Sequence, residues 1–291
     1  GSRLVFDGQG HLFITLGDRG VRPSAQDLSS HMGGVIRVNL DGSVPADNPF
    51  LGQDGVLPEF WSYGHRNQQG AALNPWTGAL WTHEHGPKGG DEINIPQPGK
   101  NYGWPIATHG INYSGEVIPE AKGETVEGME NPHHVWPVSP GVSGMAFYNH
   151  ERFPAWKHSL FVGALAQRAL IRLTLDGDAV TGEERLLEDL GYEVISQEAN
   201  HDVVLQNNQI DNMVTQGVAA IIVVAEDGDA AATAVDAAAA AGVHVLAYDR
   251  LIKSPNIAAY LSFNNVEVGR QQALGVLAAL DIDGGTWTAE N

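Results

Sequence analysis

Short runs that alternate between apolar and polar residues fill the first two-thirds of the chain, and turn residues separate them. Alternation with a period of two is typical of β-strands, and Gly, Asn, Asp or Pro between two such runs indicates a hairpin. Few stretches carry apolar residues at helical spacing, so the pattern predicts an all-β domain that is a sandwich, a barrel or a propeller. The expected strands are Arg3–Asp7, His11–Leu16, Val35–Leu40, Ala71–Leu73, Ala79–Thr82, Leu160–Ala164 and Ala169–Leu175.

The last third of the chain alternates between strand and helix patterns. Val203, Ile210, Met213 and Val214 follow helical spacing, and Ala219–Val224 is an unbroken apolar run of the kind found in buried parallel strands. This order of elements predicts half of a doubly wound parallel sheet. The other expected elements are strands at Tyr192–Ser196 and Val243–Ala247 and helices at Asp229–Ala241, ended by Gly242, and at Asn264–Leu280.

Composition changes where the pattern changes. Residues 1–190 hold six of the seven Trp and ten of the twelve His, whereas residues 191–291 hold only Trp287 and contain the Ala-rich run Ala230–Ala241. We therefore expect a domain boundary near residue 190, with one domain over 1–190 and a second over 191–291.

Charge and cysteine content narrow the function classes. The 291 residues carry a formal net charge of −19, and such a surface repels the phosphate backbone of nucleic acids. The absence of Cys excludes disulfides and thiolate metal sites without fixing the compartment. No apolar run is long enough to span a bilayer, and the opening Arg3-Leu-Val-Phe is strand-like rather than a signal peptide.

Three motifs lie close together in the first domain. They read Trp61-Ser-Tyr-Gly-His-Arg-Asn-Gln-Gln-Gly70, His83-Glu-His-Gly-Pro-Lys-Gly-Gly-Asp-Glu-Ile-Asn94 and Asn101-Tyr-Gly-Trp-Pro105. In this order they resemble the soluble aldose sugar dehydrogenases of the glucose/sorbosone dehydrogenase family, over residues 1 to about 190. The resemblance implies a six-bladed β-propeller, of which this chain has sequence for about half. It also implies pyrroloquinoline quinone (PQQ) and calcium as cofactors, and oxidation of the sugar C1 hydroxyl to a lactone.

The resemblance also implies roles for particular residues. Arg66, Asn67 and His85 would contact the quinone, and a guanidinium fork suits its carboxylates. Trp136 would flank the cofactor pocket, although a core aromatic of the propeller explains it nearly as well. An ordinary loop arginine remains the alternative for Arg66.

Calcium ligands follow from the same resemblance. The backbone carbonyls of Gly86 and Pro87 would hold the calcium ion of the cofactor, because calcium prefers hard oxygen ligands. Side chains matching a second calcium site are Asp91, Glu92 and Tyr102, for which solvated loop residues are an equal alternative. The spacing His83-x-His85 also occurs in zinc sites, but on its own it is weak support for one.

Three departures from the family pattern lower the expected activity. The catalytic histidine of the family lies upstream of Gly1, and Ala166 stands where the family has a cofactor-binding lysine. Arg168 lies two residues further on, where a strand would turn its side chain elsewhere. The paired arginines of the family lie beyond residue 190, where this chain leaves the pattern. We expect the chain to oxidise sugars poorly, and an open propeller edge to favour association.

A second resemblance begins at Gly191. Its motifs are Gly191-Tyr-Glu-Val-Ile-Ser-Gln, Gln209-Ile-Asp-Asn-Met213 and Val243-His-Val-Leu-Ala-Tyr-Asp-Arg-Leu-Ile252. Together they resemble the N-terminal lobe of periplasmic xylose-binding proteins over residues 190–281, which implies a periplasmic location. Asp249 and Arg250 follow an expected strand, where open α/β sheets bind ligands, so they would contact sugar unless they form a simple loop ion pair. Asn264 and Asn265 depart from the family pattern.

Three functional hypotheses remain open at this stage. The chain is an aldose dehydrogenase, a pentose-binding module, or a joined sequence without a common function. The third is favoured, since no Gly/Ser-rich or Pro-rich linker separates the two patterns and each pattern is incomplete. The expected fold is accordingly a partial β-propeller followed by a partial doubly wound lobe.

Overall fold

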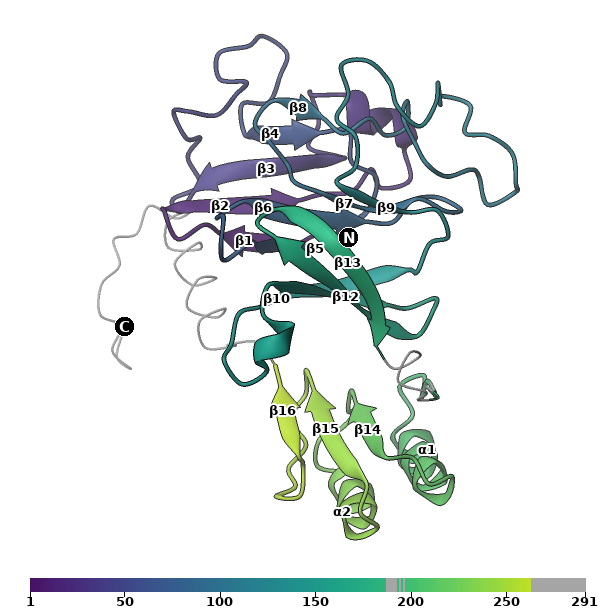
Figure 1. The fold of residues 1–291 in the computed structure, drawn as a ribbon. Coiled ribbons are helices and arrows are strands. Elements are labelled where there is room, and N and C mark those ends of the chain that lie inside the picture. The colour runs from purple at the N-terminus through teal and green to yellow at the C-terminus, as the bar shows by residue number, and fades with distance from the viewer. Residues whose placement is uncertain (187–192, 194, 196, 263–291) are drawn as a thin grey trace, which may run out of the picture. The chain divides into compact units, whose positions relative to one another are not determined.

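The computed structural model describes residues 1–186, 193, 195 and 197–262. The chain divides into two compact units, Gly1–Val194 and Ile195–Asn291, which are coloured from purple to green and from green to yellow in Figure 1. The expected boundary at residues 190 and 191 lies outside the described residues, as do the helix expected at Asn264–Leu280, Trp287 and most of the strand expected at Tyr192–Ser196.

Three β-sheets build the first unit. The first has the order β1-β2-β3-β4-β8, and it is antiparallel except for β8, which pairs parallel to β4. The second has the order β5-β6-β7-β9, and the third has the order β10-β11-β12-β13; both are antiparallel throughout. The strands are β1 (Leu4–Phe6), β2 (His11–Thr15), β3 (Gly34–Asn39), β4 (Phe60–Tyr63), β5 (Gln68–Leu73), β6 (Leu80–Glu84), β7 (Asp91–Asn94), β8 (Lys100–Asn101), β9 (His134–Trp136), β10 (Val142–Tyr148), β11 (Ser159–Ala164), β12 (Ala169–Asp176) and β13 (Ala179–Leu186), with 3-10 helices η1 (Arg22–Gln26) and η2 (Pro154–Trp156).

The seven strands expected in this unit are confirmed, and two of them extend by two or three residues beyond an expected end. β5 begins at Gln68 and β6 continues to Glu84, because the polar ends of both strands pair with each other across the sheet. This extension brings the motif residues around Arg66 and Glu84 to the ends of paired strands.

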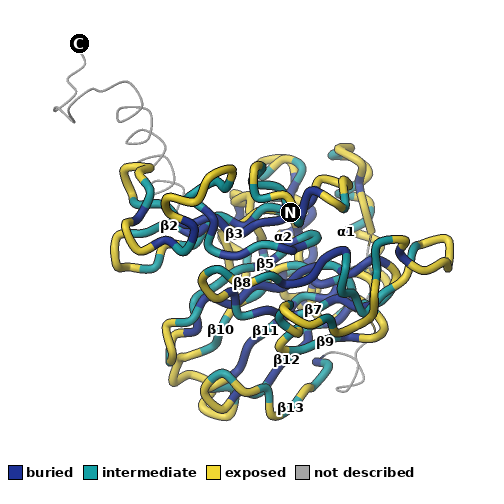
Figure 2. The backbone as a smooth tube through the Cα atoms, turned by 90° about the horizontal axis from the view of Figure 1, so that it is seen from above, coloured by how far each residue is buried: buried dark blue, intermediate teal, exposed yellow. Residues whose placement is uncertain are grey.

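The second sheet lies between the other two, since β5 contacts both β1 and β10. Apolar side chains including Phe13, Val35 and Leu80 fill the space between the first and second sheets. A larger apolar cluster that includes Trp81 and Leu160 fills the space between the second and third sheets. In Figure 2 the buried positions follow the strands, while the exposed positions gather in the loops.

The second unit is a three-stranded parallel sheet with two helices. Its elements are α1 (Val203–Thr215), β14 (Ala220–Val223), α2 (Ala232–Ala240), β15 (His244–Tyr248) and β16 (Ala259–Leu261), and β15 pairs with both other strands. The expected alternation of helix and parallel strand is confirmed. Gly242 follows α2 with φ +83°, the left-handed geometry expected after a helix end.

Two details of the second unit differ from expectation. Ile222 in β14 is 71% exposed, so within the described residues this strand is buried on one face only, although its sequence resembled that of a strand buried on both. Helix α2 begins at Ala232 rather than Asp229, because the Asp227 carboxylate accepts hydrogen bonds from the Asp229 and Ala230 amides and holds them in a preceding turn.

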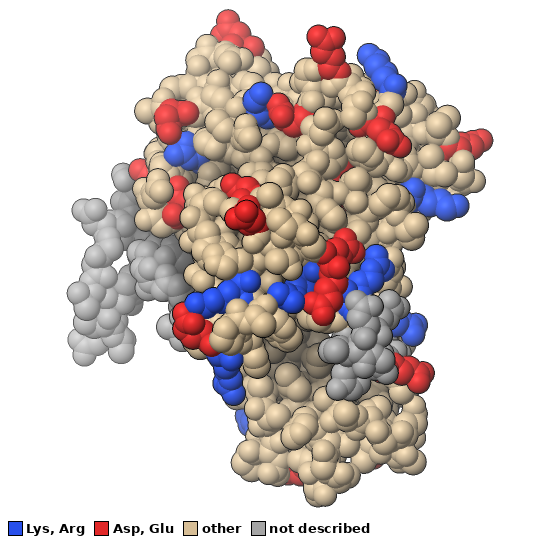
Figure 3. Space-filling view, viewed as in Figure 1, with Lys and Arg blue, Asp and Glu red and all other residues tan. Residues whose placement is uncertain are grey.

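Surface charge agrees with the acidic composition. Acidic and basic side chains lie intermingled on the face of the first unit seen in Figure 3, and no single basic patch covers it. Within the described part of the chain, no helix has the length and apolar character needed to cross a membrane.

Candidate functional site

The end of β6 sends consecutive side chains to opposite faces of the second sheet, as a strand must. His83 points toward the third sheet, where a Cβ on Gly70 would come within 2.3 Å of His83 Nε2 and 2.8 Å of Met145 Cγ. Glu84 points toward the first sheet, where its carboxylate meets the His65 ring. One strand therefore contributes to two different layers.

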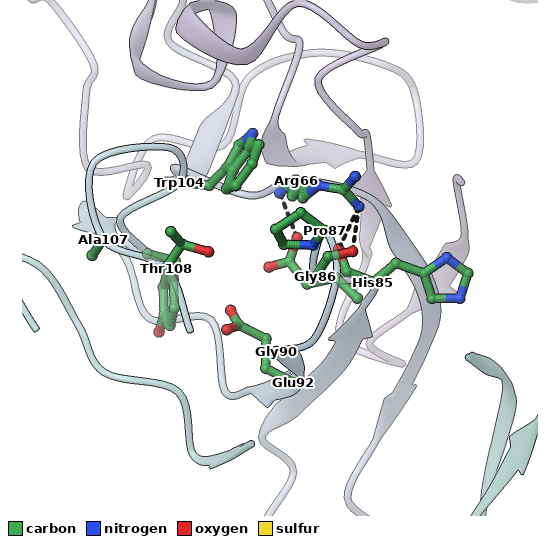
Figure 4. Close-up of a pocket in the computed structure, with 11 residues that line it drawn as sticks. Arg66, His85, Gly86, Pro87, Gly90, Glu92, Trp104, Ala107 and Thr108 are labelled. Carbon is green, nitrogen blue, oxygen red and sulfur yellow. Dashed lines mark hydrogen bonds between the residues drawn. The ribbon is translucent and has the colours of Figure 1, made fainter. Parts of the chain in front are cut away.

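Arg66 and Asn67 join the first sheet to the second, between β4 and β5. The guanidinium of Arg66 donates from Nη1 to the carbonyls of His85 (2.9 Å) and Gly86 (2.7 Å). Its Cζ atom lies 5.2 Å from the centroid of the Trp104 ring, within cation–π range. Figure 4 shows the Arg66 guanidinium pointing at these two carbonyls.

Asn67 points its side chain to the other side of this loop. Its Oδ1 accepts from the Gly1 amine at 2.5 Å and from Gln69 Nε2 at 2.9 Å. His85 Nε2 donates to the Val142 carbonyl at 2.6 Å, which leaves Nδ1 as an acceptor that faces Asn67 Nδ2 at 3.4 Å. His85 thereby has a defined tautomer, and in Figure 4 its ring turns away from the cavity beside Glu92.

Glu84 is buried, with 2% of its surface exposed, and both of its carboxylate oxygens accept hydrogen bonds. Its Oε1 accepts from His65 Nδ1 and Asn94 Nδ2, both at 3.1 Å. Its Oε2 accepts from the backbone amides of Arg66 and, at 3.1 Å, of Asn67. Burial alone would raise the pKa of Glu84, but the hydrogen bond from His65 and those from the two amides hold it below its ordinary value.

A second carboxyl group, Glu92, lies opposite Glu84 on the paired strand β7. Asn94 Nδ2 bridges the two groups, with 2.9 Å to Glu92 Oε1. Burial first, and the charge of Glu84 second, raise the pKa of Glu92 well above its ordinary value. Glu92 points into a cavity of about 20 Å³, which is room for about one water molecule. The surroundings of the pair therefore favour the negative charge on Glu84 over Glu92.

A larger cavity of about 270 Å³ opens on the other side of the loop that carries Arg66 and Asn67. The carboxylate of Asp18 lies in its wall and accepts from Trp104 Nε1 (2.8 Å) and from the Gly20 amide (2.9 Å). The lining residues include two arginines and an asparagine, which can donate to an anionic ligand, beside the acidic Asp18. The lining residues are Gly1, Gly17, Asp18, Arg19, Gly20, Arg66 and Asn67.

Four of the five residues expected to bind calcium line the cavity of about 20 Å³, and Asp91 lies outside its lining; the four are Gly86, Pro87, Glu92 and Tyr102. The Gly86 carbonyl is occupied by the Arg66 guanidinium, which is a cation itself. The side chains of Asp91 and Glu92 point to opposite faces of β7, and the second calcium site expected at Asp91, Glu92 and Tyr102 stays a prediction. Asp91 instead accepts from three backbone amides, and Tyr102 donates its hydroxyl to the Ile95 carbonyl at 2.6 Å.

Two further expected site residues have other surroundings. Trp136 is 3% exposed and packs in the core between the second and third sheets, where its Nε1 donates to Glu183 at 3.0 Å; it lines neither cavity described above. His83 is fully buried, and no group of three or more His, Cys, Asp or Glu able to hold a metal occurs among the described residues. The zinc alternative for His83 and His85 therefore finds no third ligand there.

Ala166 lies in the turn between β11 and β12, not in a strand. Its amide donates to the Pro140 carbonyl, and its side chain is exposed. The strand argument used for Arg168 is wrong, because Arg168 lies in the same turn with φ +51°. The position of the family lysine thus carries no charge in this chain.

The carboxyl edge of the parallel sheet in the second unit gathers the expected sugar contacts. Asp249 follows β15 with φ +65°, and its carbonyl accepts from the hydroxyls of Tyr260 and Ser262, each at 3.0 Å. Arg250 donates to the carbonyl of Glu226, which follows β14. The Asp249 and Arg250 side chains therefore do not pair with each other in a loop ion pair, and both residues are exposed.

The motif residues of the first unit have counterparts in known proteins. The chain is 57% identical to aldose sugar dehydrogenase YliI of Escherichia coli (strain K12) over 194 residues, which are 67% of this chain and 52% of that protein. The crystal structure of the soluble E. coli aldose sugar dehydrogenase in the apo form is similar with a TM-score of 0.63 and 59% identity, over 65% of this chain and 55% of that one. The PQQ-bound aldose sugar dehydrogenase of Streptomyces coelicolor is similar with a TM-score of 0.50 and 30% identity, over 64% and 48%.

A shorter similarity concerns a different class of protein. The chain is 40% identical to the D-xylose-binding periplasmic protein of Escherichia coli (strain K12) over 86 residues, which are 30% of this chain and 26% of that protein.

Family membership rests on the longer match. The chain spans about half the length of the aldose sugar dehydrogenases it matches. The family model described as "Glucose / Sorbosone dehydrogenase" matches residues 1–237, which extends beyond the boundary expected at residue 190. The chain therefore belongs to the glucose/sorbosone dehydrogenase family.

Proposed function

We propose that the first unit binds pyrroloquinoline quinone at Arg66 and Asn67 and acts as the cofactor-binding part of an aldose sugar dehydrogenase. The observation that carries this proposal is that two consecutive residues, Arg66 and Asn67, line a cavity of about 270 Å³ together with Arg19. Such donors suit a quinone that carries several carboxylates. Arg66 and Asn67 would hold the quinone, which would supply a two-electron acceptor for the oxidation of the sugar C1 hydroxyl to a lactone.

The residues of this chain have binding and orienting roles in the proposal. Arg66 binds a carboxylate with its planar guanidinium group. The Trp104 ring, over which this group lies, restricts its orientation. Asn67 donates through Nδ2, and His85 holds that amide from its acceptor nitrogen. The Asp18 carboxylate accepts a hydrogen bond from the Trp104 indole and so holds this ring in place beside Arg66.

A direct titration tests quinone binding. Arg66→Gln removes the charge and the fork, and we expect it to weaken PQQ binding about 10- to 100-fold, as loss of a charge-assisted pair does. Arg152→Gln is the matched control, because Arg152 is an exposed arginine of the same unit that lines neither cavity. Equal affinity of the two variants, or no binding by the unchanged chain, would refute the proposal.

We also propose that sugar turnover by this chain is slow. None of the described histidines lines the larger cavity, and Ala166 supplies no charge for the cofactor. A missing general base lowers a rate by about 10²- to 10⁴-fold. In a dye-coupled assay with PQQ and an aldose we expect little turnover, and rapid turnover would contradict this part.

Calcium does not fit the described geometry as well as the quinone does. A cation held by the Gly86 and Pro87 carbonyls would have to displace the Arg66 guanidinium from Gly86. We therefore route no step of the reaction through calcium.

A second candidate function is pentose binding by the second unit. The observation that favours it is the position of Asp249 and Arg250 at the carboxyl edge of a parallel sheet, the edge at which such sheets bind ligands. The named xylose-binding relative is periplasmic, and we propose the same location for this chain. One lobe should hold sugar weakly, so isothermal titration with xylose should give no micromolar affinity, and micromolar binding would make this the leading function.

A third possibility is that two sequences were joined near residue 190 without a common function. The DNA across the codons for Leu190 and Gly191 tests it, because reads that end or disagree there would reveal a joint. Continuous reads would favour a real fusion. Association through open strand edges also stays a prediction, which light scattering can test.

A further inference from the structure

The buried carboxylate of Glu84 has no role in the proposed function so far. We infer that Glu84 is the positioning residue that fixes the Arg66–Asn67 dipeptide in its ligand-binding orientation. The expected effect on quinone binding rests on the proposed function. The expected effect on the loop rests only on the contacts of Glu84.

All four neighbours of the Glu84 carboxylate are hydrogen-bond donors or can act as donors. They are the amides of Arg66 and Asn67 on Oε2, and His65 Nδ1 and Asn94 Nδ2 on Oε1. Only an ionised carboxylate accepts on both oxygens without presenting a hydrogen to any of them. Four such bonds to a group that is 2% exposed hold it in one orientation.

Three consecutive residues bind this one carboxylate, which determines the path of the loop. The His65 ring is held from the other side by Ser62 Oγ at 2.9 Å and stacks on Tyr102, with 4.8 Å between ring centroids. The chain enters the loop through Gly64, whose φ of +80° and close approach to Asn101 leave no room for a Cβ. With the backbone of residues 65–67 fixed, the side chains of Arg66 and Asn67 leave the loop toward the His85–Gly86 carbonyls and the larger cavity.

Asn94 lies between the carboxyl groups of Glu84 and Glu92. Its Nδ2 donates to both Glu84 and Glu92, so it separates the two groups and holds each in place. The amides of Arg66 and Asn67 thus bond to the Glu84 carboxylate and not to Glu92.

The first arm of the test needs no cofactor. In Glu84→Gln one oxygen becomes an NH₂ group that faces donors, and we expect hydrogen exchange at the amides of Arg66 and Asn67 to rise at least about ten-fold. Asp178→Ala is the control. It removes an acceptor of three hydrogen bonds between the second and third sheets, so it destabilises the unit without touching this loop. We expect no selective rise at these two amides in the control.

The second arm measures PQQ affinity by quenching of tryptophan fluorescence. Glu84→Gln should weaken binding about ten-fold or more, while Asp178→Ala should leave the affinity of the folded molecule unchanged. Unchanged exchange and unchanged affinity in Glu84→Gln would overturn the inference. If the unchanged chain does not bind PQQ, the proposed function fails, and the exchange arm still decides the role of Glu84.

Glu84→Asp covers the case in which Glu84→Gln does not fold. The shorter side chain keeps the carboxylate but places it one methylene further from the loop. Hydrogen exchange at the amides of Arg66 and Asn67 should therefore rise while the fold persists. Protection of both amides equal to that of the unchanged chain would overturn the inference as well.

Discussion

The two interfaces of the second sheet differ in what fills them. On the side of the third sheet, large apolar side chains including Trp81, Ile93 and Leu173 form the core, and all three are fully buried. On the side of the first sheet, the motif end of the interface is polar: Glu84, His65 and Asn94 form a connected network there. Both faces belong to the same strands, since alternate residues of β6 and β7 point to opposite sides.

The difference separates stability from function. Apolar burial is non-directional and tolerates small shifts, so the face toward the third sheet stabilises the fold without fixing any one group. A buried polar network is stable only when each member has its partners, so it fixes the positions of its members. Quinone affinity should therefore respond to the polar interface, and unfolding free energy should respond most strongly to the apolar one.

The largest effect should come from the apolar side. Trp81→Ala removes a fully buried ring and its hydrogen bond to Asp178, and we expect it to lower the free energy of unfolding by about 3–5 kcal/mol. Urea denaturation followed by tryptophan fluorescence measures the first unit, which holds most of the tryptophans. The PQQ affinity of the folded molecule should not change; a ten-fold loss at constant fold would show that the two interfaces are coupled.

His83, on the side of the third sheet, should make the free energy of unfolding depend on pH. Burial lowers the pKa of His83 to about 4, and both ring nitrogens lack a hydrogen-bond partner in the described structure. The unfolded chain binds a proton near pH 6.5 and the folded chain does not until about pH 4, so stability falls as pH drops through this window. The loss is on the order of 3 kcal/mol.

Denaturation curves of His83→Phe against pH check this assignment. The variant carries no titrating group at this position, so its free energy of unfolding should vary less between pH 6.5 and 4 than that of the unchanged chain. The same slope in both proteins would mean that other groups cause the acid sensitivity.

Periodicity was enough to predict the strands of the first unit and the alternating elements of the second, because one face of each is buried and the pattern of burial is local. The ends of β5 and β6 were missed, since Gln68, His83 and Glu84 are polar residues buried by partners distant in sequence. Strand geometry was wrongly assumed for Arg168, which lies in a turn whose Ala166 and Gln167 amides bond to the Pro140 carbonyl, distant in sequence.

The candidate site was predicted unevenly. The motif located the Arg66–Asn67 pair at the cavity, but Glu84 and Asp18 were not recognised, because their roles depend on backbone amides and an indole from other strands and loops. The available signal for Glu84 was its place between two histidines just after the expected strand Ala79–Thr82. The second calcium site at Asp91, Glu92 and Tyr102 stays a prediction, and the alternation of side chains along a strand puts Asp91 and Glu92 on different faces of β7.

A smaller effect, opposite in sign, should come from Glu92 on the polar side. Its folded-state pKa is raised, by burial and then by Glu84, so its contribution to stability is present below pH 4.5 and is lost as pH rises toward the folded value. Glu92→Gln mimics the neutral form and should gain on the order of 1 kcal/mol relative to the unchanged chain at pH 8. Melting curves at pH 4.5 and pH 8 measure this, and a variant that is less stable at both values would exclude a neutral Glu92.

Calcium should have the smallest effect of all. The Gly86 carbonyl is bound by Arg66, and Asp91 is used by the amides of Gly86, Gly141 and Val142, so the oxygen ligands of the expected ion are already engaged. A ligand that binds the folded state raises its stability by mass action, so millimolar calcium without quinone should leave the melting temperature unchanged within about 1 °C. Magnesium at the same concentration controls for ionic strength. A rise specific to calcium would mean that Arg66 yields the Gly86 carbonyl to the ion.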